Sequence, residues 1–104
     1  MTLLSKNKKI KIAIVGCGRI FLNHYKSLTQ LKNKFELVAL CEIDKNKIKK
    51  LDNYSLPIYS TINDLIKNHK LDYVSLCTPS GLHYEQAKFF LNKKINVITE
   101  KPIS

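Results

Sequence analysis

Ile10–Phe21 reads IKIAIVGCGRIF. A largely apolar run of strand length stops at a Gly-x-Gly turn, and a helical pattern begins at once. Gly16 allows a tight turn off the strand, and Gly18 has no Cβ to keep a pyrophosphate from the backbone. The free amides at the helix start then face the phosphates, where the helix macrodipole favours negative charge. The stretch therefore predicts a dinucleotide-binding strand–turn–helix.

The turn departs from the usual three-glycine pattern at one position. Phe21 stands where the third glycine is expected, so we expect the helix to pack less closely on the strand there. A β–α turn that binds no ligand is the alternative interpretation of this segment taken alone.

The rest of the chain predicts an α/β fold with a doubly wound parallel sheet. Helical patterns alternate with five apolar runs, an order typical of βαβ units. The five predicted strands are Ile10–Val15, Phe35–Cys41, Pro57–Tyr59, Tyr73–Cys77 and Asn96–Thr99. A complete dinucleotide fold has six strands. We therefore expect residues 1–104 to be an incomplete N-terminal dinucleotide-binding domain, with the substrate domain following in a longer polypeptide.

The net charge of +10 raises the possibility of nucleic-acid binding. The basic residues are lysines spread over nearly every segment, Arg19 being the one arginine, and no aromatic residues interleave with them as a stacking platform. We therefore expect no nucleic-acid partner. The run from Lys45 to Lys50 is interpreted as a solvated helix face.

Localisation follows from hydropathy and from the three cysteines. The chain has no apolar run of membrane-spanning length and no signal peptide at its start, so a cytoplasmic protein without a membrane span is expected. Cys17, Cys41 and Cys77 fit no metal-ligand spacing and are interpreted as small buried thiols, with no metal site.

An acidic residue stands where the second strand ends. Glu42 lies roughly 20 positions beyond the glycine turn, where a carboxylate binds the ribose hydroxyls and repels a 2′-phosphate. Glu42 therefore predicts NAD rather than NADP as cofactor, and Asp44 is expected to cap the next helix. The alternative is that Glu42 is merely an exposed residue at a strand end.

Two further strand ends carry polar residues toward the same sheet edge. After the fourth strand, Thr78 and Ser80 can donate hydroxyl hydrogen bonds and Pro79 stiffens the loop. His83 either contacts the ligand or packs within the helix. After the fifth strand, Lys101 stands between Glu100 and a proline and is either a proton-transfer group or a solvated lysine.

Taken together, these motifs resemble the glucose–fructose oxidoreductase / inositol dehydrogenase family. The similarity runs from Ile10 onward, and the combination in order and spacing is more specific than any one motif. The GRIxxNH pattern is similar to the UDP-N-acetylglucosaminuronate 3-dehydrogenase branch, which serves polysaccharide biosynthesis. The matching segments are Val15–Ile20, Asn23–His24, Glu36–Glu42, Cys77–Ser80 with His83, and Glu100–Pro102.

The resemblance implies an NAD-dependent oxidoreductase that acts on a sugar or nucleotide-sugar hydroxyl. Lys101 would be catalytic and assist proton removal from the substrate. The implied cofactor-binding residues are Gly16, Gly18, Arg19, Ile20, Glu42, Thr78, Pro79, Ser80, His83 and Glu100. Glu42 replaces the aspartate of most relatives.

The family's catalytic histidine and substrate domain would lie beyond Ser104. The chain alone is therefore expected to be inactive, and the full-length protein to be a homo-oligomer. The other hypothesis is a non-catalytic nucleotide-binding module or a truncated remnant.

Overall fold

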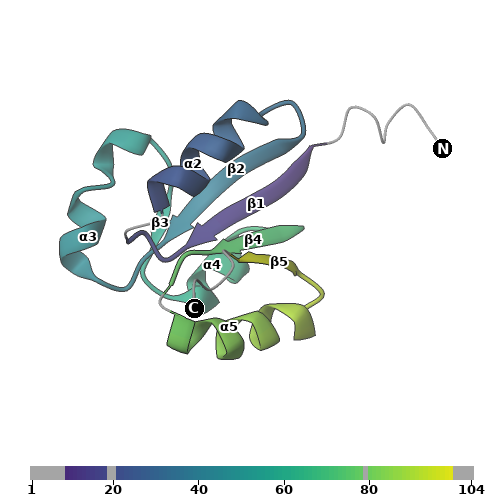
Figure 1. The fold of residues 1–104 in the computed structure, drawn as a ribbon. Helices are drawn as coiled ribbons and strands as arrows, with labels where there is room; N and C mark the ends of the chain where they lie inside the picture. Colours follow the sequence, from purple (N-terminus) through teal and green to yellow (C-terminus); the bar gives the residue numbers. More distant parts are fainter. Residues whose placement is uncertain (1–8, 19–20, 79, 100–104) are drawn as a thin grey trace.

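The computed structural model describes residues 9–18, 21–78 and 80–99. Five parallel strands form one sheet in the order β3-β2-β1-β4-β5 (Figure 1). The strands are β1 Ile10–Val15, β2 Phe35–Cys41, β3 Ile58–Tyr59, β4 Tyr73–Leu76 and β5 Asn96–Thr99. This is the strand order of a dinucleotide-binding fold, so the predicted Rossmann-like α/β class is confirmed.

Two strands are one residue shorter than predicted. β3 starts at Ile58 because Pro57 has no N–H for the ladder, although its carbonyl still accepts from Leu40 N at 2.9 Å. β4 ends at Leu76, and Cys77 N donates to Val15 O at 2.8 Å where the chain leaves the sheet.

Helices cover both faces of the sheet, with α2 on one face and α4 and α5 on the other (Figure 1). Their bounds are α2 Phe21–Gln30, α3 Lys45–Lys49, a 3₁₀ turn Asp52–Tyr54, α4 Ile62–Asn68 and α5 Ser80–Asn92. The predicted Asp44 cap is confirmed, because Asp44 accepts from Asn46 N at 2.9 Å. Thr61 caps α4 in the same way and accepts from Asp64 N at 3.1 Å. Within the described ranges, no helix has the length and apolarity needed to cross a bilayer.

The core follows from the alternation of side chains along β1. Ile12 and Ile14 point to the face covered by α2, where they pack with Phe21 and Leu28. Ala13 and Val15 point to the other face, in one cluster with Leu65 of α4 and Phe90 of α5. All four β1 residues are buried, as expected for a parallel strand between two helical layers.

Gly16 follows β1 and lies against Thr78, which follows the neighbouring strand β4. Its φ is +88°, and an added Cβ would lie 2.5 Å from Thr78 Cγ2 and 2.8 Å from Thr78 N. Both the left-handed backbone and the close approach of Thr78 therefore require glycine here.

We predict that Gly16→Ala lowers the free energy of unfolding by about 2–4 kcal/mol, because it adds backbone strain and overlap with Thr78. The matched control is Gly81→Ala in α5, where an added Cβ meets nothing within 4 Å. That variant should be as stable as the parent or more stable by up to about 1 kcal/mol. Urea unfolding measures both, and equal stability of the two variants would contradict the prediction.

Candidate cofactor-binding site

The candidate site lies at the carboxyl edge of the sheet, between the ends of β1 and β4. The chain passes from β1 to α2 on one face of the sheet and from β4 to α5 on the other, so the connections of two neighbouring strands diverge at this edge. Open α/β sheets bind ligands at such a switch point. Gly16, Gly18, Glu42 and Thr78 all lie at this edge of the sheet.

Gly18 presents open backbone to this edge. Among the described residues, a Cβ added to Gly18 would have one neighbour within 4 Å, the Lys47 Nζ at 3.5 Å. The helix α2 begins three residues later, and Phe21 N donates to Gly18 O at 3.2 Å. The open space beside Gly18 and the nearby helix start together fit the approach of a phosphate to the backbone.

Phe21, at the position of the third glycine, is buried in the core. Its ring lies edge-on to Tyr54 with centroids 5.2 Å apart, and Tyr25 packs beside both rings. The aromatic cluster thus secures the start of α2 against the turn that follows α3.

Glu42 is buried, with 8% of its surface exposed, and both carboxylate oxygens accept backbone N–H groups. Oε1 accepts from Cys17 N at 2.6 Å and Oε2 accepts from Asp44 N at 2.8 Å. The interpretation of Glu42 as an exposed strand-end residue is therefore wrong. A carboxylate has about four lone-pair positions, so the two hydrogen bonds from described residues leave Glu42 with further acceptor capacity.

Thr78 faces the glycine turn with its methyl group and helix α5 with its hydroxyl. Its Oγ1 donates to Gln86 Oε1 at 2.6 Å, so the hydroxyl hydrogen expected to serve a ligand is engaged within the chain. The hydroxyl oxygen can still accept a hydrogen bond, and the predicted part of Thr78 in cofactor binding stays a prediction.

Several predicted site residues lie outside the described residues. For Ser80 and His83 the structure gives the backbone in the first turn of α5, and their side chains are outside the description. The residues with no described position are Arg19, Ile20, Pro79, Glu100 and Lys101.

Lys47 is the residue that sequence reasoning missed. It belongs to the lysine run interpreted as a solvated helix face, and Lys47 is indeed exposed, but its Nζ also lies over Gly18. Its position three residues after the cap Asp44 is the one sequence feature that sets it apart. Lys45 and Lys49 on the same helix have the same side chain, so the sequence alone does not distinguish Lys47 from them. A second missed contact joins His24 Nδ1 of α2 to Ser75 Oγ of β4 and ties the helix to the sheet.

The three cysteines are buried, as predicted. Burial, reinforced by the Glu42 carboxylate, raises the pKa of Cys17 to about 12 and that of Cys41 to about 11. Both thiols are therefore protonated and weakly nucleophilic at neutral pH. Within the described part of the chain, no group of three or more His, Cys, Asp or Glu residues could hold a metal ion.

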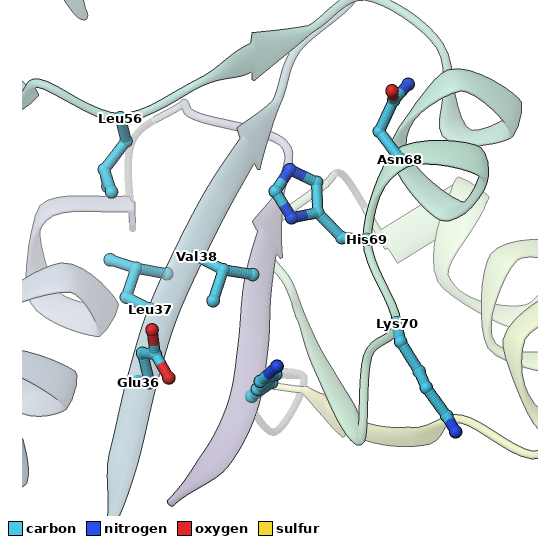
Figure 2. Close-up of a pocket in the computed structure, with 8 residues that line it drawn as sticks. Glu36, Leu37, Val38, Leu56, Asn68, His69 and Lys70 are labelled. Atoms are coloured by element: carbon cyan, nitrogen blue, oxygen red, sulfur yellow. The ribbon is translucent and has the colours of Figure 1, made fainter.

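A separate cavity of about 480 Å³ opens at the amino edge of the sheet (Figure 2). It lies beside the starts of β1 and β2 and the segment that leads from α4 into β4, on the opposite edge from Gly18. It is lined by Lys11, Glu36, Leu37, Val38, Leu56, Asn68, His69 and Lys70. Its lining includes none of the predicted cofactor-binding residues.

The fold and the carboxyl-edge geometry define a dinucleotide-binding Rossmann domain. A family model described as "Oxidoreductase family, NAD-binding Rossmann fold" matches residues 10–104, and the chain belongs to this family. NAD is the cofactor of such domains, and the described residues fit it: Gly18 is open, Glu42 has free acceptor positions and Lys47 supplies a positive charge.

The curated relatives include two sugar or polyol dehydrogenases. The chain is 28% identical over 95 residues to D-glucoside 3-dehydrogenase of Escherichia coli, with 89% of this chain and 27% of that protein covered. It is 30% identical over 98 residues to inositol 2-dehydrogenase of Salmonella typhimurium, with 91% and 29% covered. The chain thus spans less than a third of the length of these relatives.

Among solved structures, two WlbA dehydrogenases in complex with NADH and UDP-GlcNAcA resemble the chain. The Chromobacterium violaceum enzyme is 35% identical with a TM-score of 0.82, covering 92% of this chain and 28% of that one. The Bordetella pertussis enzyme is 32% identical with a TM-score of 0.85, covering 93% and 30%. Myo-inositol 2-dehydrogenase of Lactobacillus plantarum is 28% identical with a TM-score of 0.79, covering 91% and 29%.

We predict that Gly18→Val abolishes dinucleotide binding and leaves the fold intact, because its branched side chain fills the space a pyrophosphate needs. The fold should persist, since the one described atom that the Cβ of residue 18 would approach is the end of a flexible lysine. Calorimetric titration with NADH should give at least a tenfold rise in Kd, with an unchanged urea midpoint. Parent-like NADH affinity would mean that the cofactor does not lie on this turn.

Proposed function

We propose that this chain is the cofactor-binding part of an NAD-dependent dehydrogenase that oxidises a hydroxyl of a nucleotide sugar. The UDP-N-acetylglucosaminuronate type is the proposed substrate. The observation that carries this choice is the likeness to the two WlbA dehydrogenases, whose identities of 35% and 32% exceed the 28% of the myo-inositol enzyme. Family membership supports the oxidoreductase class.

The proposed protein is longer than this chain. Residues 1–104 form its N-terminal dinucleotide-binding domain, and a substrate domain beyond Ser104 supplies the sugar pocket and the catalytic histidine. The share of the WlbA enzymes that the chain covers, 28% and 30%, supports this division. We further propose a cytoplasmic homo-oligomer that acts in polysaccharide biosynthesis.

In the proposed mechanism, this chain binds the cofactor and removes a proton. Because Gly18 has no side chain, the pyrophosphate would reach the backbone at the start of α2. The Glu42 carboxylate would accept hydrogen bonds from the ribose hydroxyls and repel a 2′-phosphate. The amine of Lys101 takes the proton of the substrate hydroxyl as that alcohol is oxidised to a ketone. Bound NAD supplies the hydride acceptor.

The substrate assignment is tested by NADH absorbance with the polypeptide that contains both domains. We predict faster reduction of NAD with UDP-N-acetylglucosaminuronate than with myo-inositol or a glucoside. Residues 1–104 alone should bind NADH and oxidise none of them. Faster reduction of NAD with myo-inositol would contradict the proposed substrate. NADH binding without turnover of any of the three compounds would support a non-catalytic nucleotide-binding module.

For Lys101 we predict that Lys101→Ala lowers turnover by about 10²–10⁴-fold, the usual contribution of a positioned acid–base group. The Kd for NADH should change little, because the phosphate and ribose contacts are made by other residues. The matched control is Lys94→Ala, a lysine beyond the end of α5 that is exposed and should retain parental turnover. Survival of turnover in Lys101→Ala would show that Lys101 is only a solvated lysine.

A further inference from the structure

The ammonium of Lys47 lies beside the glycine turn, although Lys47 is on a different element from that turn. A methyl group at Gly18 would sit 3.5 Å from the Lys47 Nζ. An anion that touches the Gly18 backbone from this side therefore comes within ion-pair distance of the ammonium. The positive charge of Lys47 also reaches the turn's middle residue, where it opposes the rise in the pKa of Cys17 that burial and Glu42 cause.

Two carboxylates fix the backbone at the start of α3, the helix that carries Lys47. Asp44 caps α3 by accepting from Asn46 N, and Lys47 N donates to Asp44 O at 3.0 Å. Asp44 N in turn donates to Glu42 Oε2, while the other oxygen of Glu42 accepts from Cys17 N. The start of α3 and the glycine turn thus share one anchor, so the backbone that carries Lys47 keeps its position relative to Gly18.

We propose that Lys47 is a binding residue for the pyrophosphate of the cofactor. The described first turn of α2 contains no acidic residue, so the partial positive charge of its N-terminus is not offset there. A pyrophosphate carries two negative charges, and a lysine binds phosphate as a full point charge on a flexible stem. The Lys47 ammonium thus supplies a full positive charge beside the partial positive charges of the backbone amides.

The geometry favours the pyrophosphate over the 2′-phosphate of NADP. Gly18 is the residue whose missing Cβ admits a pyrophosphate to the turn, and Lys47 lies over Gly18. A 2′-phosphate would instead meet the buried carboxylate of Glu42, which repels it. This proposal rests on the NAD-binding role of the chain and adds one residue to it.

The test compares Lys47→Ala, Lys47→Arg and the matched control Lys49→Ala, a lysine on the same short helix. Calorimetric titrations use NADH, NADPH and ADP-ribose, which carries the pyrophosphate without nicotinamide. We expect Lys47→Ala to raise the Kd for NADH and the Kd for ADP-ribose about tenfold each, which is the effect of losing one charge-assisted hydrogen bond. Lys47→Arg should stay within about threefold of the parent because it keeps the charge, and Lys49→Ala should match the parent.

Salt provides a second readout. The affinity of the parent for ADP-ribose should fall more steeply with sodium chloride than that of Lys47→Ala, because the variant has lost one ionic contact. Unchanged urea midpoints for all three variants confirm that the substitutions leave the fold intact.

Three results would overturn the proposal in distinguishable ways. Equal NADH affinity of the parent and Lys47→Ala would reduce Lys47 to a solvated lysine and leave the NAD-binding role standing. A loss of affinity confined to NADPH in Lys47→Ala would show that the lysine binds a 2′-phosphate and not the pyrophosphate. A parent that binds neither NADH nor ADP-ribose would remove the NAD-binding role itself, and this proposal with it.

Discussion

Both oxygens of the buried Glu42 carboxylate accept backbone N–H groups, one from the glycine turn and one from the approach to α3. A buried charge is stable only when it is well hydrogen-bonded, so the chain around Glu42 must supply donors on both sides. Cys17 N and Asp44 N meet this requirement. The turn after β1 and the segment after β2 are thereby held in one arrangement before any ligand binds, which lowers the ordering cost of binding.

The remaining features of the site depend on this arrangement. Gly16 lets the turn approach Thr78 after β4, and Thr78 is held through Gln86 of α5. On the other side, the helix that begins after Glu42 carries Lys47 back over Gly18. Elements from both faces of the sheet thus converge on one edge, where the backbone of Gly18, the ammonium of Lys47 and the carboxylate of Glu42 lie near one another.

Local rules predicted much of this from the sequence. The strand ending at Val15, the cap Asp44 and the position of Glu42 follow from an apolar run of strand length, capping chemistry and spacing along the chain. The contacts that sequence reasoning missed join residues through the fold. Lys47 has the same sequence signal as its neighbouring lysines, and only tertiary structure sets it over Gly18. The pairing of His24 with Ser75 spans 51 positions in the sequence, beyond the reach of any helical or strand period.

The bridging role of Glu42 is tested most directly by amide hydrogen exchange of the parent and Glu42→Ala. The account predicts that the Cys17 and Asp44 amides of the parent exchange about a hundredfold or more slowly than in an unfolded chain. Both should lose that protection together in the variant, while the Val15 and Leu40 amides inside the sheet stay protected. Fast exchange at Cys17 in the parent, or continued protection of both amides in Glu42→Ala, would contradict the account.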